Sequence, residues 1–530
     1  MTRLGQFAII ALFLSVLYVP LVLSLVLKDK EISESEKRKL AKLPSLEWSM
    51  DSLSKYPGRF ETYYNDHFGL REQLVELYNY LYFKVVRKSP LPSVTVGRNE
   101  WLYYTAEGVL NDFLGLTGYS EEQLENWKRL LADREEWLDE LGIRYLFAVA
   151  PYKMMIYPEN LPARVQRRAG TPLLARLSDY VARHGDLDGY LDLRHDQRSA
   201  KAWRQVYYRT DTHWNPDGAF DAYTAIMQQV RRWFPDVKML AEGSLKKTME
   251  TRRGDICITL NLNTIAPEET VKSVVQPSCA AGEYSRLDLD IPAIGDEARN
   301  PNYLPVRNGC PDATLKALVI HDSFGLFLRP YFNETFREVV YSNYIDLKDL
   351  KGFITSDKPD LVIDLRVARH LSGMLEPDPE MERSLLEKHA PLSTDVRLLI
   401  DGAHGTEHLG DARELAVQQV HEGLLLRANG NDPSLELNFA AETDGDPLLV
   451  HLFLDSPRDT ELQIFYTTPE SAEFSPEHEI RKKIRKGNND LLFRLPHPRT
   501  AGKLRLDPGI GSGDYLLRSL VIARESRAEK

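Results

Sequence analysis

Cysteine is scarce in this chain of 530 residues, which carries only Cys257, Cys279 and Cys310. The three form no C-x-x-C pair of the kind that zinc sites use. A single disulfide, with Cys279 and Cys310 as the favoured partners, would suit an oxidising compartment, although the odd count leaves this open. Long basic runs are also missing, and the net charge is −11. The charge pattern therefore argues against a nucleic-acid partner.

Charged residues are absent from positions 4–27, which are mostly Leu, Val, Ile, Ala and Phe. A run of this length can span a bilayer as a helix, with Arg3 before it and Lys28 after it. A cleaved signal peptide is the alternative, but the run exceeds a usual apolar core and residues 25–28 offer no small-residue cleavage site. We expect an uncleaved membrane anchor within residues 1–30, followed by a translocated body.

The length also exceeds what one compact core supports, so two or three domains are expected. Residues 31–93 are first charged and then rich in aromatics at helical spacing, which indicates a stalk and a helical extension. Residues 94–390 alternate between helical patterns and apolar runs of strand length. This alternation predicts an α/β domain with a mainly parallel sheet, and residues 246–311 are expected to form long loops or a small insertion over its site.

Tryptophan is missing from the last third of the chain, where the pattern changes. From residue 394 to 526, short alternating runs are separated by turn signals such as Gly430-Asn431-Asp432. This pattern predicts a β-sandwich or jelly-roll domain. Such domains often bind glycans, but this one lacks tryptophan for stacking on sugars, so glycan binding and a structural role remain equal alternatives.

The first candidate site residues are Asp211 and His213, in the run Asp-Thr-His. In an extended segment these two side chains would face the same pocket. Asn215 is a suitable N-cap and Pro216 a suitable first helical residue, so a helix should follow. A carboxylate that orients an imidazole suits general acid–base chemistry. A structural Asp–His contact in a loop is the alternative for this motif alone.

A nucleophile is supplied more than a hundred residues later. The apolar run 315–321 predicts a buried strand, and helix-like residues resume at Phe324. Ser323 would then lie on a tight strand-to-helix turn, a geometry that exposes a hydroxyl at the edge of a sheet. The backbone N–H groups of Ser323 and Gly325 could stabilise an oxyanion there. An Asp-Ser helix cap is the structural alternative.

Another buried strand is predicted at 143–150, and ligands in α/β sheets bind beyond the carboxyl ends of strands. Tyr152 and Lys153 follow this strand directly and are candidate substrate contacts. With the triad Ser323, His213 and Asp211, they predict a site that carries out acyl chemistry on a hydroxylated or anionic substrate.

Together these motifs resemble the alginate O-acetyltransferase family of SGNH hydrolase-like enzymes, of the AlgJ/AlgX type. The resemblance covers roughly residues 35–375. The matching pieces are Asn65-Asp66-His67-Phe68-Gly69-Leu70-Arg71, Ala150-Pro151-Tyr152-Lys153, Ile156-Tyr157-Pro158-Glu159, Tyr208-Arg209-Thr210-Asp211-Thr212-His213-Trp214-Asn215, Gly254-Asp255 and His321-Asp322-Ser323-Phe324.

The resemblance implies a Ser323–His213–Asp211 triad in a periplasmic enzyme that is anchored in the bacterial inner membrane. It implies transfer of acetyl groups to exopolysaccharide hydroxyls without a cofactor, with a multi-span membrane O-acyltransferase as acetyl donor. The domain at 394–526 would correspond to a carbohydrate-binding module. One departure is His321, which stands where the wider superfamily has Gly. The third oxyanion donor is uncertain, with Asn343 as the candidate and a structural turn as the alternative.

Three other functions share parts of this pattern. An esterase would use the same triad with water in place of the sugar hydroxyl. A metal site could be built from Asp211, His213, His321 and Asp322. A non-catalytic glycan-binding scaffold could retain the fold without the chemistry.

Overall fold

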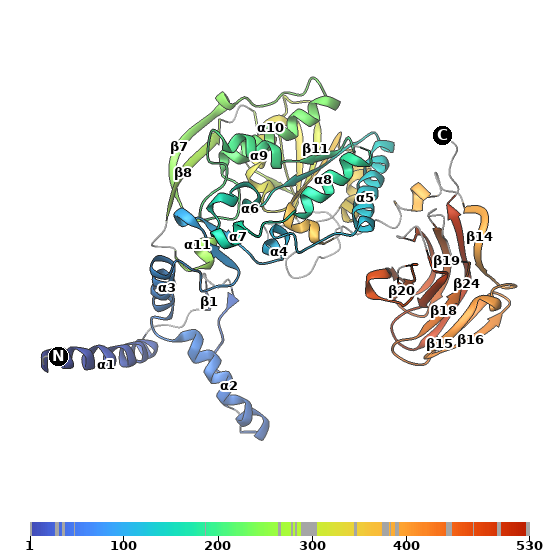
Figure 1. Ribbon diagram of the computed structural model, residues 1–530, viewed down its shortest axis with the longest axis horizontal. Coiled ribbons are helices and arrows are strands. Elements are labelled where there is room, and N and C mark those ends of the chain that lie inside the picture. The colour runs from blue at the N-terminus through green and yellow to red at the C-terminus, as the bar shows by residue number, and fades with distance from the viewer. Residues whose placement is uncertain are drawn as a thin grey trace.

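The fold is taken from a computed structural model, which describes most of the chain (Figure 1). The described residues are 3–26, 31–33, 38–46, 48–185, 187–262, 267–276, 279–280, 283–287, 305–343, 347–373, 381, 383–386, 392–440, 448–469, 471–495 and 500–525.

A seven-stranded sheet forms the centre of the α/β domain, in the order β6-β5-β13-β11-β12-β10-β9. Neighbouring strands from β6 to β12 pair in parallel, whereas β10 and β9 pair antiparallel. Because parallel strands point the same way, the carboxyl ends of β5, β11, β12 and β13 meet at one edge. The strands are β5 (Arg144–Ala150), β6 (Tyr190–Asp192), β9 (Ser285–Arg286), β10 (Val306–Asn308), β11 (Lys316–His321), β12 (Glu338–Asn343) and β13 (Leu361–Val367).

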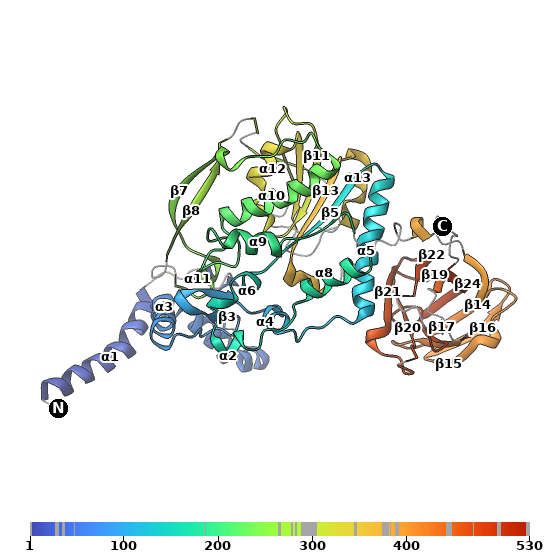
Figure 2. The same cartoon turned by 45° about the horizontal axis from the view of Figure 1, so that its top comes forward.

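Helices cover this sheet on both sides. Figure 2 shows α9 and α10 on one side and α5 and α13 on the other. The helix α5 begins with the capping box of Ser120 and Gln123, and the side chain of Asn215 caps α10, as their sequences predicted. The helices of this domain are α4 (Val109–Phe113), α5 (Glu121–Glu140), α6 (Lys153–Ile156), α7 (Ala163–Gln166), α8 (Leu173–Arg183), α9 (Arg194–Lys201), α10 (Pro216–Trp233), α11 (Asp255–Thr259), α12 (Arg329–Thr335) and α13 (Lys351–Asp357).

The region 246–311, expected to hold long loops or a small insertion, contains two long strands. The strands β7 (Leu245–Arg252) and β8 (Glu268–Val275) pair antiparallel over their full length and form a ribbon. Four of the eight residues of β7 are charged, which hides the apolar alternation by which strands are recognised in a sequence. Farther along, Cys279 and Cys310 form the disulfide that the sequence favoured. Cys257 is buried.

The N-terminal part contains helices and two short strand pairs. Its elements are α1 (Arg3–Val26), β1 (Ile32–Ser33), β2 (Arg38–Lys39), α2 (Met50–His67), α3 (Arg71–Leu81), the π-helix η1 (Tyr82–Val86), β3 (Val94–Val96) and β4 (Leu102–Tyr104). Asp66 accepts a hydrogen bond from the Ala41 N–H, and a ring nitrogen of His67 lies 2.8 Å from the Ala41 carbonyl oxygen, so this Asp-His pair has a structural role. Within the ranges given above, no helix combines the length and the apolar composition that a bilayer crossing requires.

The C-terminal part consists of two antiparallel sheets whose inner faces share one apolar core. The sequence predicted eight of its strands, and the structure adds β15, β16 and β21, whose exposed polar residues obscure the pattern. One sheet contains β14 (Leu392–Ile400), β16 (Leu415–Val420), β17 (Gly423–Ala428), β19 (Leu448–Ser456), β22 (Gly487–Arg494) and β24 (Gly513–Glu525). The other contains β15 (Leu409–Arg413), β18 (Ser434–Asn438), β20 (Thr460–Tyr466), β21 (Glu479–Ile484) and β23 (Lys503–Asp507).

A buried ion pair joins α5 to the middle of the parallel sheet. Arg134 Nη1 lies 3.2 Å from Asp364 Oδ2, and both side chains are at most 1% exposed. The Tyr145 hydroxyl and the Arg366 guanidinium also donate to this carboxylate. Removing one partner from such a pair leaves an uncompensated charge in the interior, which is more costly than the pair itself is stabilising.

We therefore predict that Asp364→Asn lowers the free energy of unfolding of the α/β domain by about 3–5 kcal/mol. Urea unfolding followed by tryptophan fluorescence measures this selectively, because all seven tryptophans lie at or before Trp233. The matched control is Asp139→Asn, whose partner Arg144 is half-exposed, with an expected loss below about 1 kcal/mol. Equal losses in the two variants would contradict the role of the buried pair.

Candidate active site

The turn that carries Ser323 follows β11 directly and is held by the carboxylate of Asp322. Asp322 Oδ1 accepts a hydrogen bond from the Phe324 N–H at 2.9 Å, and Oδ2 accepts one from the Val367 N–H at 2.7 Å. Because Val367 ends the neighbouring strand β13, the two bonds fix the turn to the carboxyl edge of the sheet. Ser323 itself is partly exposed, as a nucleophile must be.

Ser323, His213 and Asp211 form one continuous chain of contacts. Ser323 Oγ lies 2.8 Å from His213 Nε2, and His213 Nδ1 lies 2.7 Å from Asp211 Oδ1. The His213 ring packs against those of Phe324 and Phe327. With its Nδ1 proton directed at Asp211, the imidazole can accept the serine proton at Nε2. The structure thus brings together the three side chains that the sequence singled out.

Asp211 is held in its charged form although it is 2% exposed. Burial by itself would raise the pKa of this carboxyl, but the hydrogen bonds and charge of His213 and the nearby guanidinium of Arg252 outweigh it, so the pKa lies well below its ordinary value. Arg252 Nη2 lies 3.3 Å from Asp211 Oδ2 and also stacks over the Tyr208 ring. Arg252 has no signal in the sequence that could have identified it.

The backbone of the Asp-Thr-His segment is bent, whereas the sequence predicted an extended one. Asp211 Oδ1 accepts a hydrogen bond from the His213 N–H at 3.0 Å, the local turn that Asp favours. The same oxygen contacts the His213 ring, so the two side chains meet through a turn and not through strand alternation. A bridge between Tyr207 and Trp214 closes the loop, which we call the catalytic loop, residues 207–214.

Buried groups of opposite charge hold the catalytic loop from two sides. Lys153 Nζ donates to the carbonyl oxygens of Tyr208, Arg209 and Asp211 at 3.1, 3.0 and 2.6 Å. The Glu268 carboxylate on β8 accepts from the N–H groups of residues 209 and 210. The loop carbonyls thus bind an ammonium and the loop amides bind a carboxylate, which satisfies a buried backbone that has no secondary structure.

A second carboxylate, Asp255 on α11, holds the middle of the loop. Its Oδ1 accepts the Thr212 N–H at 2.7 Å, its Oδ2 accepts the Thr212 hydroxyl, and Oδ2 lies 3.6 Å from His213 Nδ1. Burial and the charge of Asp211 raise the pKa of Asp255. Gly254 allows this contact, because a Cβ there would lie 2.1 Å from the Thr210 carbonyl oxygen. Gly254-Asp255 was one of the motifs that carried the family resemblance, but the sequence did not predict its role.

The expected substrate contacts Tyr152 and Lys153 have other partners. Lys153 is 4% exposed, and burial lowers its pKa to about 8 against the opposing charges of Asp211, Asp255 and Glu268. The Tyr152 hydroxyl donates to the buried carboxylate of Asp112. Both side chains are thus engaged with other residues of the site, and direct contact with substrate stays a prediction.

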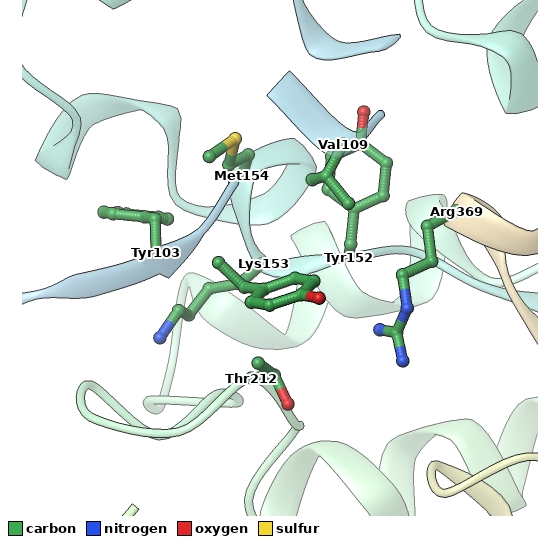
Figure 3. Close-up of a pocket in the computed structure, with 8 residues that line it drawn as sticks. Tyr103, Val109, Tyr152, Lys153, Met154, Thr212 and Arg369 are labelled. Atoms are coloured by element: carbon green, nitrogen blue, oxygen red, sulfur yellow. The ribbon is translucent and has the colours of Figure 1, made fainter. Parts of the chain in front are cut away.

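Beside the catalytic loop lies a small pocket in which Lys153 and Tyr152 form part of the wall (Figure 3). Thr212 and Arg369 are on its polar side, and Thr212 directly precedes His213. Arg369 Nε lies 3.2 Å from the half-exposed carboxylate of Glu107. The other lining residues are Tyr103, Tyr104, Val109 and Met154.

The two candidate oxyanion donors differ in their surroundings. The Gly325 N–H donates to the Asp322 carbonyl oxygen at 3.1 Å, so it is engaged in the turn. Asn343 ends β12 in register with His321, at the same edge as Ser323, and its buried Oδ1 has no hydrogen-bond partner among the described residues.

His321 has a structural role that explains its unusual place in the motif. Its Nδ1 donates to the Asp322 carbonyl oxygen, and its Nε2 accepts from the Arg329 guanidinium at 3.0 Å. Burial and the Arg329 charge lower the pKa of this imidazole to about 4. The ring lies against Gly325, where a Cβ would come within 2.4 Å of it. A bulky residue at position 321 thus requires glycine at position 325.

The metal site considered from the sequence is not assembled. Both ring nitrogens of His321 have other partners, and the Asp322 oxygens accept backbone N–H groups. Among the described residues, one different group could hold an ion: Asp211, His213 and Asp255 offer ligand atoms within 4.8 Å of one another. In the structure, these atoms are engaged with each other and with Thr212.

We predict that Lys153→Met loosens the catalytic loop, because three carbonyl oxygens lose their donor and an unsatisfied buried group costs about 1–3 kcal/mol. Hydrogen exchange of peptides covering residues 207–214 should become faster in this variant. Lys201→Met is the control, since Lys201 lies on α9 and binds Glu159 instead. Unchanged exchange in Lys153→Met would refute the role of the ammonium.

A second prediction concerns the stability of the α/β domain at low pH. The folded state keeps His321 neutral down to about pH 4, whereas the unfolded chain protonates it near 6.5. Between these values the unfolded state binds more protons, so stability falls as the pH falls, by at most about 3 kcal/mol. Tryptophan-monitored unfolding of the α/β domain should show a steeper loss in the natural chain than in His321→Gln. Parallel losses would mean that His321 does not contribute.

Comparison with known proteins finds a family model and curated relatives that match part of the chain. Residues 94–283 match the model of the SGNH hydrolase-like domain, acetyltransferase AlgX. The chain is 26% identical over 264 residues to a probable alginate O-acetylase AlgJ of Pseudomonas syringae pv. tomato, covering 47% of this chain and 65% of that protein. The probable AlgJ of Pseudomonas fluorescens is 27% identical over 261 residues, with 46% and 62% covered. The chain thus spans less than two thirds of the length of these relatives.

Among solved structures, the O-acetyltransferase domain of Pseudomonas putida AlgJ aligns at 18% identity with a TM-score of 0.34, covering 54% of this chain and 94% of that one. The resemblance inferred from the motifs is confirmed by the family model over residues 94–283 and by the curated relatives, which are named probable alginate O-acetylases.

Proposed function

We propose that the chain is a serine-dependent O-acetyltransferase that acetylates hydroxyl groups of an exopolysaccharide. The observation that carries the proposal is the continuous chain of contacts from Ser323 through His213 to Asp211. The names of the relatives, probable alginate O-acetylases, indicate that the transferred group is acetyl and that the acceptor is a polysaccharide.

In the first half of the reaction, His213 Nε2 removes the proton from Ser323 Oγ as this oxygen attacks the acetyl carbonyl carbon. The tetrahedral intermediate collapses when His213 returns the proton to the leaving group, which leaves an acetyl-serine. Asp211 stays ionised throughout, because its pKa is held low, and it stabilises the imidazolium that forms. General base help of this kind is worth about 10²–10⁴ in rate.

The oxyanion of the intermediate needs donors at the edge of the sheet. We assign this role to the backbone N–H of Ser323 and to the side-chain amide of Asn343, which lies at the end of the adjacent strand β12. Gly325, the other candidate, would have to give up its bond to the Asp322 carbonyl oxygen. A single oxyanion donor typically contributes about 10²–10³ in rate.

In the second half, the same imidazole takes the proton of a sugar hydroxyl, whose oxygen attacks the carbonyl carbon of acetyl-serine. The intermediate then expels Ser323 Oγ, which takes the proton back from His213. We place the accepting hydroxyl group in the small pocket lined by Thr212, the residue that directly precedes His213. Arg369 supplies a cation at the wall of this pocket, as a charged sugar would require.

If water took the place of the sugar hydroxyl, the enzyme would be an acetylesterase, so acceptor binding decides between the two reactions.

We further propose that the chain acts at the periplasmic face of the bacterial inner membrane and receives acetyl groups from a multi-span membrane O-acyltransferase. The disulfide between Cys279 and Cys310 fits an oxidising compartment. The uncharged run 4–27 would be the anchor, and α1 exposes large apolar side chains such as Phe7 and Leu12. The domain from residue 394 would bind the glycan.

The proposal predicts that Ser323→Ala and His213→Ala lower acetyl transfer from an activated acetyl ester to an oligosaccharide by at least about 10²-fold without unfolding the protein. Mass spectrometry should detect an acetyl adduct on Ser323 in the natural chain. Ser356→Ala, an exposed serine on α13, is the matched control and should retain both activity and adduct.

Product analysis completes the test. Acetylated oligosaccharide is expected, whereas release of acetate alone in the presence of a good acceptor would identify an esterase. Full activity of Ser323→Ala would reject the triad. Activity that disappears with a chelator and returns with a metal ion would favour a metal mechanism at Asp211, His213 and Asp255 instead.

A further inference from the structure

The continuous helical segment α3–η1 exposes an apolar stripe on one side. Its members recur at helical spacing and are large: Leu74, Leu77, Tyr78, Leu81 and Val85, with Leu77, Tyr78 and Val85 exposed by 51%, 56% and 74%. We call this set the α3 stripe. The rings of Tyr78 and Tyr82 contact each other along its edge. Such a row of large apolar side chains in water is a surface that a partner normally covers.

The opposite side of the same segment is packed on the domain. Asn79 is buried and donates to the Leu260 carbonyl oxygen at 2.7 Å, just beyond α11. Phe83 lies in a small core with Ile256 and Cys257 of α11. The segment is therefore fixed in orientation, and the α3 stripe cannot turn inward to bury itself.

The charges around the α3 stripe are positive. Lys84, Arg87 and Lys88 are exposed at its C-terminal end, and Lys84 contacts the carboxylate of Glu100. By helical spacing, the acidic Glu72 and Glu76 lie on the side that faces α11. Basic residues beside an apolar stripe, with tyrosines at the boundary, are the pattern of a helix that lies in the headgroup region of a membrane.

The helix α3 also begins next to α1. The end of α1 packs on the turn that precedes α3, where a Cβ on Gly69 would lie 2.1 Å from the Pro20 carbonyl oxygen and 2.8 Å from the Ser24 nitrogen. Figure 1 shows α3 beside the C-terminal end of α1 and running across its direction. If α1 is directed into a bilayer, α3 lies at the height of its surface.

We propose that the α3 stripe is a second membrane contact, which lies in the headgroup region of a phospholipid bilayer while Lys84, Arg87 and Lys88 face anionic lipid phosphates. The proposal rests on the proposed anchoring of α1. Basic residues are attracted to an anionic lipid surface, and the apolar side chains add their burial.

This contact would determine where the active site stands. The inner side of α3–η1 packs on α11, and α11 carries Asp255, which holds Thr212 of the catalytic loop. The path from bilayer to catalytic loop therefore contains only packed, hydrogen-bonded elements. A flexible tether would let the site sample all orientations, whereas two contacts on one rigid body fix its height and direction above the membrane.

The test uses the full chain in nanodiscs of phosphatidylethanolamine and phosphatidylglycerol. A nitroxide is attached to Leu77→Cys or Leu81→Cys, and its collisions with dissolved oxygen and with a water-soluble nickel chelate are compared by electron paramagnetic resonance. The matched control is Met249→Cys on β7, which is 66% exposed and remote from α3 in sequence. The natural chain, treated with the same nitroxide reagent, reports any label on Cys257. Tryptophan-monitored unfolding checks that each variant folds.

Contact with lipid predicts an oxygen-to-nickel ratio several-fold higher at positions 77 and 81 than at 249. A ratio equal to that of the control in incorporated protein overturns the membrane contact and leaves the anchor standing. Shielding from both reagents also overturns it, because it would show that protein, such as a second copy, covers the stripe. Failure of the chain to enter nanodiscs overturns both the anchor and the contact, but leaves the acetyl-transfer chemistry untouched.

Discussion

The buried ammonium of Lys153 is the contact on which the geometry of the site depends. It binds three carbonyl oxygens of the catalytic loop, while Glu268 binds amides of the same loop. A loop in the interior must satisfy its backbone polar groups without a ladder or a helix. Here two side chains of opposite charge do so, and the low dielectric that makes their burial costly also strengthens each bond. Because these bonds hold the backbone of the loop, they also hold Asp211 and His213 in place.

The same loop connects parts of the chain that are distant in sequence. Lys153 follows β5, Glu268 lies on the ribbon strand β8, and Asp255 lies on α11. Across the sheet edge, Asp322 fastens the Ser323 turn to β13. The two halves of the triad are therefore fixed to one sheet by independent sets of bonds, which sets the separation of Ser323 Oγ and His213 Nε2. Positioning of this kind, rather than added reactivity, is what a serine–histidine pair requires.

Much of the fold could be predicted because its strands are uniformly apolar. The runs that became β5, β11 and β13 are buried on both faces, so burial and sequence pattern agree. The ribbon β7–β8 and the strands β15, β16 and β21 were missed, since exposed strands carry polar residues on both faces and lose the alternation. The bent Asp-Thr-His segment was also misjudged, because an Asp side chain can close a local turn as readily as strand alternation can align two residues.

The sequence by itself singled out Ser323, His213 and Asp211, because each occurs in a local context of strand end, turn or helix start that suits the role predicted for it. It also placed the cap of α10 and the favoured disulfide partners. Only the tertiary structure decided that Lys153 and Tyr152 support the site and that Asp255 and Glu268 belong to it. The physical reason is that these residues act through partners far along the chain, and no local pattern records which backbone groups a buried charge will meet.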